Sequence, residues 1–376
     1  EWSASDVKYY FGGWEDGSMK TGWQKITVHD NEDGKDDDYD YWFNFKSNGE
    51  RRFHDKADAT WKSNSRYYHF DERGVMVYQW FETATTNSAS ASNWAYFSSP
   101  EDGARVTKGW FKVVAPTEDN SFLESDATFA TKDSNDESER WYYSDSKDEG
   151  LVVGEIKKIK GKYYGFWPDD GQKGGRMLIG LCALQMNEAD GSKIDKVVMA
   201  DMDNDDLDDF MDNVDAGLYD DSNVYLYYFG DDADADGSMK TGSVSVNLDG
   251  DSYQFQFKKT GAADSRGRGV TGIDDGKYIY KYGQKIKADS DDKYVLLHAT
   301  GNINETDVKV FDYDNADIKN IDGIKAFDLP AKEGSDEDNL RGYYGFGTAK
   351  QNPADPAKGG WFLVNTSGRI QTGTKS

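Results

Sequence analysis

The segment YYFGGWEDGSMKTGW, residues Tyr9–Trp23, indicates the fold, because a close copy returns at Tyr227–Ser243 as YYFGDDADADGSMKTGS. Each copy has an aromatic triplet, a polar turn with Asp-Gly, and a second glycine a few residues later. Aromatic side chains favour a half-buried pleated strand, and Asp-Gly supplies the positive φ of a tight turn. The pattern therefore predicts a β-hairpin that turns at the Asp-Gly pair.

More eroded copies of this pattern recur along the chain. Their aromatic groups are Tyr41–Phe43, Tyr67–Phe70, Trp94–Phe97, Trp141–Tyr143, Tyr163–Phe166, Tyr253–Phe255, Tyr278–Tyr280 and Trp361–Leu363. A single hairpin is only marginally stable in water, so each must cover the rings of its neighbour. We therefore expect an all-β, elongated solenoid of stacked β-hairpin repeats with a short α-helical insert.

The composition limits the kinds of function. Aromatic residues make up 14% of the 376 residues, and the formal net charge is −26. Nucleic acid is not an expected partner, because phosphate binding depends on Lys and Arg. No apolar run approaches the roughly 20 residues that span a bilayer, so we expect no membrane insertion. The single cysteine, Cys182, allows no intramolecular disulfide. Such an acidic chain fits a secreted or cell-surface-associated protein.

The phrase YYF…DGSMKTGW resembles the cell-wall-binding repeat family, which includes choline-binding modules, glucan-binding repeats and the repeats of large clostridial toxins. The resemblance covers most of residues 8–182 and 225–287, with a weaker trace at 340–373. We expect a repeat block at 1–182, an acidic insert with a short helix at 183–222, a second repeat block at 223–292, a small β insert at 293–342 and a terminal repeat at 343–376.

The helix of the acidic insert is predicted at Asn204–Gly217, NDDLDDFMDNVDAG. Asn204 is a suitable N-cap, and Gly217 can end the helix. Apolar residues at helical spacing form one stripe that should pack on the repeats, namely Leu207, Phe210, Met211 and Val214.

In the choline-binding branch, the resemblance implies ligand pockets between successive repeats, each walled by the Trp of a Gly-Trp pair and by aromatic residues of the next two repeats. The candidate pockets are Trp23 with Trp42 (or Tyr41) and Tyr68, Trp110 with Trp141 and Tyr164, and Trp80 with Trp94. Ring faces attract a quaternary ammonium, and they also stack on the apolar face of a sugar. The alternative is that these rings belong to the aromatic spine.

The Gly-Trp pair is lost in the later copies. The residue after the corresponding glycine is Glu155, Leu181, Ser243, Ile273 or Thr374, none of which can wall an aromatic cage. We therefore expect the opening half to bind ligands, and the later half to serve mainly as scaffold or to bind something else.

Asp232, Asp234 and Asp236 with Gly237 spell D-x-D-x-D-G, which is how calcium loops begin. However, Ser243 stands where such a loop needs a bidentate Glu, and an ordinary solvated turn is the competing interpretation. We expect no required cofactor, and weak calcium binding somewhere on the acidic surface.

No catalytic constellation is apparent. The histidines, His29, His54, His69 and His298, lack ligand spacing, and Cys182 has no evident catalytic partner. We therefore expect a non-catalytic module that binds a carbohydrate or cell-wall polymer. A net charge of −26 favours a neutral glycan over phosphate-rich polymers. The alternatives are binding of choline on teichoic acid and a protein-binding surface adhesin with a host-protein partner.

Overall fold

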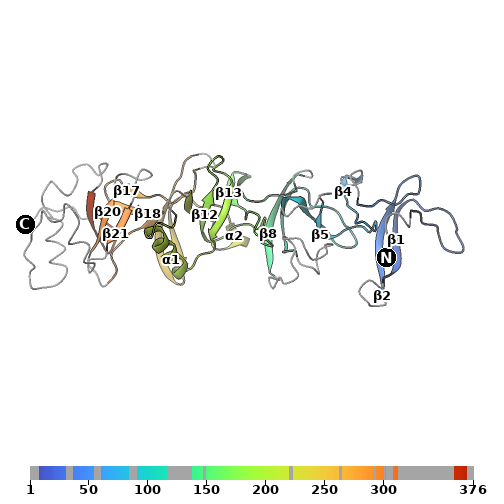
Figure 1. The fold of residues 1–376 in the computed structure, drawn as a ribbon, viewed down its shortest axis with the longest axis horizontal. Coiled ribbons are helices and arrows are strands. Elements are labelled where there is room, and N and C mark those ends of the chain that lie inside the picture. Colours follow the sequence, from blue (N-terminus) through green and yellow to red (C-terminus); the bar gives the residue numbers. More distant parts are fainter. Residues whose placement is uncertain are drawn as a thin grey trace, which may run out of the picture. The chain divides into compact units, whose positions relative to one another are not determined.

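The computed structural model describes residues 8–30, 37–54, 61–83, 91–116, 138–146, 150–219, 223–261, 265–290, 294–299, 301, 308–311 and 360–370. The chain forms two compact units. Figure 1 shows their strands and helices. The first unit combines Glu1–Glu155 with Phe166–Met177, and the second combines Ile156–Gly165 with Leu178–Ser376. Strands far outnumber helices in both, so the all-β hairpin-repeat fold is confirmed.

The first unit consists of antiparallel sheets, most of them two-stranded hairpins. They are β1 with β2, β3 with β4, β5 with β6, and β7 with β8 and β9. The strands are β1 (Gly22–Asp30), β2 (Asp37–Phe45), β3 (Lys62–Ser63), β4 (Arg66–Tyr67), β5 (Gln79–Glu82), β6 (Trp94–Phe97), β7 (Gly109–Val114), β8 (Glu139–Ser146) and β9 (Gly150–Leu151), with a 3-10 turn η1 (Ala91–Asn93) before β6.

The pairing of these hairpins corrects the sequence prediction. The strand that starts at Gly22 pairs with the next aromatic triplet, from Gly22 opposite Phe45 onward, whereas the Asp-Gly turn closes only an isolated bridge between Phe11 and Met19. Gly22 and Gly109 have φ of +72° and +103°, a region that favours glycine, so the chain redirects itself there. The Asp-Gly turns therefore link one hairpin to the next.

Successive turns are in contact through a repeated arrangement at their glycines. The side chain two residues beyond one turn glycine lies against the turn glycine of the following repeat, where any Cβ would overlap it. We call it the covering side chain. The pairs are Met19 on Gly49, Arg51 on Gly74 and Met76 on Gly103 in the first unit, and Met239 on Gly267 in the second.

The core of the first unit is aromatic. Trp80, Trp94 and Tyr142 are fully buried and form one cluster with Ala91 and Leu151. A separate cluster near β2 contains Phe43, Phe45 and Val75, against which Tyr41 packs. Ring packing between neighbouring hairpins therefore replaces a large aliphatic core.

The second unit has the two-stranded sheet β10–β11, the sheets β13–β12–β14 and β21–β20–β22, and the five-stranded sheet β15–β16–β19–β18–β17. The strands are β10 (Ile156–Ile159), β11 (Lys162–Gly165), β12 (Leu181–Met186), β13 (Ile194–Met199), β14 (Val224–Tyr228), β15 (Gly242–Leu248), β16 (Asp251–Phe257), β17 (Gly272–Asp274), β18 (Tyr278–Lys281), β19 (Gln284–Lys285), β20 (Tyr294–Ala299), β21 (Val308–Phe311) and β22 (Gly360–Asn365).

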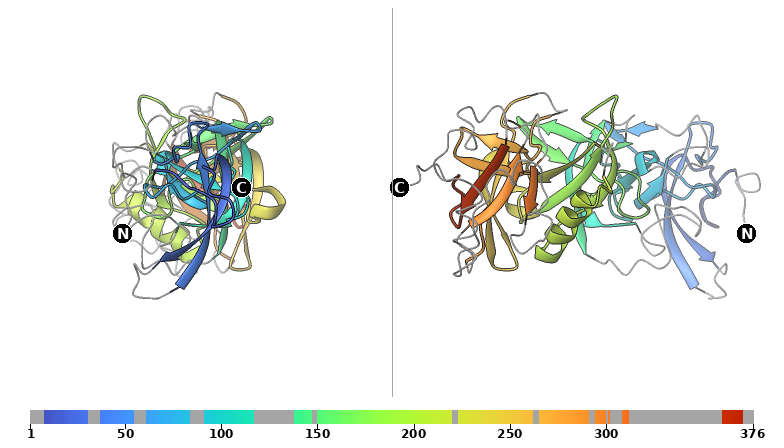
Figure 2. Two further views of the ribbon diagram at one scale, coloured as in Figure 1. Left: turned by 90° about the vertical axis from the view of Figure 1, so that its right-hand side faces the viewer. Right: turned by 60° about the vertical axis from the view of Figure 1, so that its left-hand side comes forward.

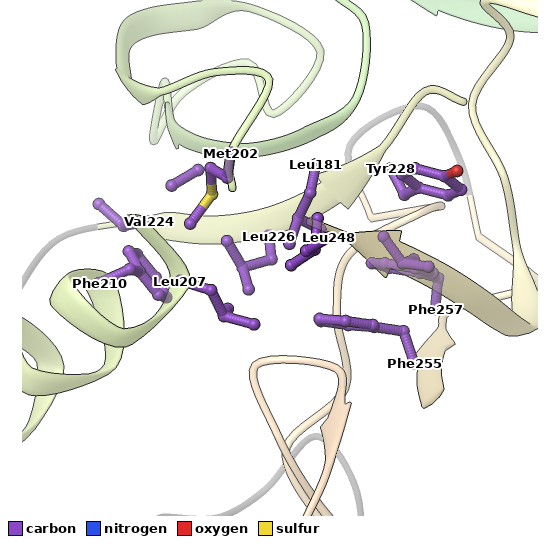
Figure 3. Close-up of a cluster of buried hydrophobic side chains, with 12 residues drawn as sticks. Leu181, Met202, Leu207, Phe210, Val224, Leu226, Tyr228, Leu248, Phe255 and Phe257 are labelled. Carbon is purple, nitrogen blue, oxygen red and sulfur yellow. The ribbon is translucent and has the colours of Figure 1, made fainter. Parts of the chain in front are cut away.

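Helix α1 (Asn204–Asp215) lies in the connection between β13 and β14 and confirms the predicted helix (Figure 2). Its N-cap is Asp203 and not Asn204, because the Asp203 carboxylate accepts from the backbone nitrogen of Asp206 in a capping box. Figure 3 shows Leu207 and Phe210 extending from the helix toward the apolar side chains of the neighbouring strands, including Leu226.

Strand β20 joins the small β insert and the terminal repeat, which the sequence predicts as separate segments. It pairs with β21 on one side and with β22 on the other, so Trp361 of the terminal repeat lies opposite His298. Much of the small β insert expected at 293–342, including the segment IDGIKAFDL at 321–329, lies outside the described residues.

Candidate ligand-binding aromatic clusters

A group of aromatic rings surrounds Trp23 at the start of β1. Its ring centroid lies 5.0 Å from Tyr68, 5.4 Å from Trp61, 5.9 Å from Phe70 and 6.4 Å from Trp42. We call these five residues the Trp23 cluster. Trp23, Trp42, Trp61 and Tyr68 are half-buried, so the cluster is partly open to solvent, whereas Phe70 is fully enclosed. The structure thus brings together the residues of the first predicted pocket.

The register of β1 and β2 explains why Trp42 and not Tyr41 joins this cluster. Trp23 lies opposite Asn44 and Lys25 opposite Trp42, so Trp42 is the diagonal neighbour of Trp23 on the same face. Successive side chains of a strand point to opposite faces. Tyr41 is therefore on the other face, where it stacks on Tyr39. The Tyr41 alternative for this pocket is accordingly set aside.

Glu101 holds the edge of the Trp23 cluster, and sequence reasoning missed it. The Trp42 Nε1 donates to Glu101 Oε2 at 3.0 Å, and Lys25 Nζ donates to Glu101 Oε1 at 2.8 Å. These two hydrogen bonds hold the pKa of the exposed Glu101 carboxyl below its usual range. Because Glu101 belongs to a turn two repeats further on, no local pattern points to it.

Trp61 is the other residue that sequence reasoning missed. It precedes the short strand β3 and stands outside any aromatic triplet. The Arg52 guanidinium carbon lies 4.2 Å from the centre of the Trp61 ring, and Arg52 Nε donates to Asn44 Oδ1 at 3.0 Å. One face of Trp61 therefore carries a fixed cation from the protein itself.

A second cluster of rings repeats this geometry at β7 and β8. Trp110 lies 6.2 Å from Trp141 at an interplanar angle of 87°, while the Trp23–Trp42 pair has 6.4 Å and 85°. Tyr143 and Phe166 complete it, at 5.1 Å and 5.6 Å from Trp110. We call these four residues the Trp110 cluster. Trp110 and Trp141 are half-buried, like their counterparts.

Tyr164 was predicted as the third wall of this second pocket. It lies in strand β11, which belongs to the second compact unit, and pairs there with Lys157. Phe166 and Tyr143 are the rings that the first unit itself contributes around Trp110.

Trp80 and Trp94, the third predicted pocket, are core residues in this structure. Both are 0% exposed, and Trp80 Nε1 donates to the Val114 carbonyl at 2.8 Å. Rings of the next hairpin cover Trp80, with Tyr142 at 5.0 Å and Phe111 at 6.1 Å. A ring enclosed in this way offers no face to a ligand, so neither tryptophan is included in the proposed sites.

The positions that replace Trp in the later repeats have different environments. Leu181 and Ile273 are buried in the cores of the second unit, and Ser243 is exposed on β15. Where an aliphatic side chain occupies this position, it packs in the core and leaves no aromatic ring open to a ligand.

The acidic D-x-D-x-D-G segment forms the short helix α2 (Ala233–Asp236) with Asp232 as its N-cap. The Asp232 carboxylate accepts from the backbone nitrogens of Asp234 and Ala235. Burial alone would raise the pKa of Asp236, but hydrogen bonds from Ser238 and two lysines hold it below its usual range. Among the described residues, no three His, Cys, Asp or Glu side chains gather closely enough to hold a metal ion. Calcium binding stays a prediction.

Two of the histidines come together although their sequence spacing suggests no pair. His54 Nδ1 and His69 Nε2 share a hydrogen bond of 2.8 Å, and the Phe81 ring lies against both. Cys182 is fully buried, and burial raises the pKa of its thiol from 9.0 to about 12. His69 and Cys182 are buried, whereas His54 is half-buried.

Comparison with known proteins gives partial likenesses only. No family model matches the chain, and no curated protein matches it. The autolysin LytC from Streptococcus pneumoniae, solved with a synthetic peptidoglycan ligand, aligns with 77% of this chain and 43% of its own at 17% identity and a TM-score of 0.29. This chain thus corresponds to less than half of LytC.

Two smaller proteins align over most of their length. CbpJ from Streptococcus pneumoniae TIGR4 aligns over 93% of this chain and 94% of its own, with 14% identity and a TM-score of 0.28. CbpF, solved in complex with ipratropium, aligns over 74% and 89%, with 16% identity and a TM-score of 0.25. At TM-scores this low, the likeness assigns neither a ligand nor an activity to this chain. No helix among its described residues is long and apolar enough to cross a membrane.

Proposed function

We propose that this chain is a non-catalytic module that binds a carbohydrate or cell-wall polymer through the Trp23 and Trp110 clusters. The observation that supports this is the repetition of one arrangement, a half-exposed Trp set edge-on to a second Trp at 6.4 Å and 6.2 Å. Leaving two large rings partly open to water at each seam costs hydrophobic free energy. A ligand that lies on those ring faces would recover it.

The chemistry of the rings fits a sugar. A pyranose has an apolar face that packs on an aromatic ring, and polar groups at the rim can bond its hydroxyls. At the Trp23 cluster, Glu101 and Lys25 form such a rim. The net charge of −26 opposes binding of a phosphate-rich polymer, whereas a neutral glycan meets no such repulsion.

The same proposal places the protein on the bacterial surface or among secreted proteins, where such polymers occur. It assigns no catalytic role to the chain. Calcium is not required in this proposal, although the acidic surface could hold it weakly. Binding of choline on teichoic acid and binding of a host protein remain as alternatives that the experiment below separates.

The test is co-sedimentation with purified bacterial cell walls together with an array of neutral oligosaccharides, each repeated with choline and with a calcium chelator. Trp23→Ala and Trp110→Ala should each lower affinity about tenfold, in line with the loss of an aromatic anchor at a binding site. Trp14→Ala is the matched control, since Trp14 is fully exposed and outside both clusters. Thermal unfolding of each variant excludes a general loss of structure.

Three results would contradict the proposal. Equal losses of glycan affinity in Trp14→Ala and Trp23→Ala would show that the clusters are not the binding sites. Unchanged glycan affinity in both Trp23→Ala and Trp110→Ala would show the same. Binding of a host protein that ignores all three substitutions would favour the adhesin.

A further inference from the structure

We infer that Arg52 is a built-in cation of the Trp23 cluster, which makes this site reject quaternary ammonium groups and select uncharged glycan. The inference rests on the proposed function, because it concerns the ligand class of one of the two proposed sites. It identifies Arg52 as a specificity-determining residue that no pattern in the sequence marks.

The position of Arg52 is fixed from two sides. Its guanidinium carbon is 4.2 Å from the centre of the Trp61 ring, and its Nε donates to Asn44 Oδ1 at 3.0 Å. Asn44 is only 4% exposed and lies directly opposite Trp23 in the β1–β2 ladder. The strand residue paired with Trp23 therefore holds the cation over the neighbouring ring.

The Trp110 cluster shows what the same backbone positions hold in another repeat. Tyr143 lies opposite Trp110 in β8, as Asn44 lies opposite Trp23 in β2. The backbone nitrogen of Val152 donates to the Tyr143 carbonyl at 2.9 Å, and that of Arg52 donates to the Asn44 carbonyl at 2.9 Å. The Asn44–Arg52 pair is thus replaced by an apolar and aromatic pair.

The presence of Arg52 in the Trp23 cluster affects which ligands can bind to its ring faces. A guanidinium and a quaternary ammonium are attracted to a ring by the same electrostatic interaction, so they compete for a face. A second cation beside Arg52 would also meet like-charge repulsion in a partly desolvated site. A neutral sugar meets no such charge repulsion, and its apolar face can pack on rings of the cluster other than Trp61.

The negative charge of Glu101 does not fully offset the repulsion between Arg52 and a second cation. Its two carboxylate oxygens accept from Trp42 Nε1 and Lys25 Nζ, so the acid already pairs with a lysine at the rim. Asp40 lies 3.8 Å from the same Lys25 nitrogen. Among the residues that the structure describes, Arg52 is the cation that lies over a ring of this cluster.

The experiment uses the full chain with the Trp110→Ala substitution, which leaves the Trp23 cluster as the site under observation. Tetramethylammonium chloride is the probe, with sodium chloride at equal ionic strength as reference, and ring-proton NMR shifts and tryptophan fluorescence report binding. Arg52→Met keeps the length of the side chain and removes its charge. We expect it to raise affinity for tetramethylammonium about tenfold, as a freed cation-binding face would.

Two further variants isolate the cause. Arg52→Lys keeps the charge and should leave tetramethylammonium binding as weak as in the parent. Arg66→Val removes an exposed arginine that pairs with Asp102, and it should also show no gain, which separates occupancy of the ring from net charge. Far-UV circular dichroism and thermal midpoints confirm that each variant is folded.

The inference is overturned if Arg52→Met binds the probe no better than its parent, or if Arg52→Lys or Arg66→Val gains as much. Failure of the proposed function looks different, since glycan and wall binding would then survive Trp23→Ala. If Trp23→Ala abolishes wall binding while Arg52→Met gains nothing, the proposed function stands and only the role of Arg52 is lost.

Discussion

Met19 packs its thioether against Gly49, so that a side chain reaching out from one turn closes over the glycine of the next. The same relation joins Met76 to Gly103. Gly49 and Gly103 have φ of +84° and +57°, where residues other than glycine are strained. Backbone conformation and side-chain packing therefore both require glycine at these turns.

Replacing a covered turn glycine should destabilise the protein. Gly49→Ala places a Cβ into the Met19 side chain and strains the backbone, and we expect a loss of about 1–3 kcal/mol in the free energy of unfolding. Gly17→Ala is the matched control, because nothing lies within 4 Å of a Cβ there, and it should change stability by less than about 0.5 kcal/mol. Urea unfolding measures both, and equal effects would contradict the covering arrangement.

Glu101 should position Trp42 for binding. Glu101→Ala removes the acceptor of the Trp42 Nε1 hydrogen bond and should weaken glycan binding by about fivefold, while the thermal midpoint stays near that of the parent protein. Asp102→Ala removes the neighbouring acid, which pairs with Arg66, and should leave glycan binding unchanged. Titration calorimetry with a bound oligosaccharide tests the pair of variants, and a similar loss in both would rule out a specific role for Glu101.

Trp80 and Trp110 should respond differently to the same substitution. Trp80→Ala opens a cavity in a fully buried cluster and should cost about 3–5 kcal/mol of stability. Trp110→Ala removes a half-buried ring and should cost less while lowering glycan affinity more. Thermal unfolding and binding, measured on both variants, would disprove this division if Trp110→Ala proved the more destabilising.

The N-cap of helix α1 should contribute to the stability of the second unit. Asp203→Ala removes the acceptor for the backbone nitrogen of Asp206, and such caps contribute about 0.5–2 kcal/mol. Asp203→Asn, which keeps a capping oxygen, should lose much less. Native-state hydrogen exchange of the helix amides resolves the local effect, and equal exchange in both variants would argue against the cap.

Alkaline pH should destabilise the protein through Cys182. Burial raises the pKa of its thiol from 9.0 to about 12, so the unfolded chain releases a proton that the folded chain retains. The stability that the protonated thiol contributes is fully present below the ordinary pKa of 9.0. It declines as the pH rises toward the folded-state pKa of about 12. Unfolding from about pH 8 to about pH 9.5, below the ordinary tyrosine pKa of about 10, should show a shallower decline of stability in Cys182→Ala than in the parent. Identical slopes would show that the thiol has no such effect.

The sequence predicts the repeat fold because its signals are local. An aromatic triplet, a polar turn and a glycine define each unit within a few residues, and the helix stripe of Leu207 and Phe210 is equally local. The predicted strand pairing is wrong because two segments resemble hairpin connections in the sequence. One is the Asp-Gly turn, and the other is the connection between β1 and β2. Which of them closes the ladder depends on the positive φ at Gly22.

The core of the Trp23 cluster can be predicted because its signals are also local. The other residues of the cluster come from contacts that are distant in the sequence. Trp23 and Trp42 are diagonal neighbours in one hairpin, so their meeting follows from strand geometry. Glu101 arrives from another repeat, and Trp80 is covered by a later hairpin. Coverage of this kind cannot be deduced from the letters around a tryptophan.

The contact between successive turns lies at one end of each hairpin. The connections from β1 to β2 and from β5 to β6 differ in length, yet Met19 and Met76 meet their glycines in the same way. Loop length is thus decoupled from the register of the stack. Evolution can diversify the tips of this protein, in size and in acidity, while the backbone of the array stays as it is.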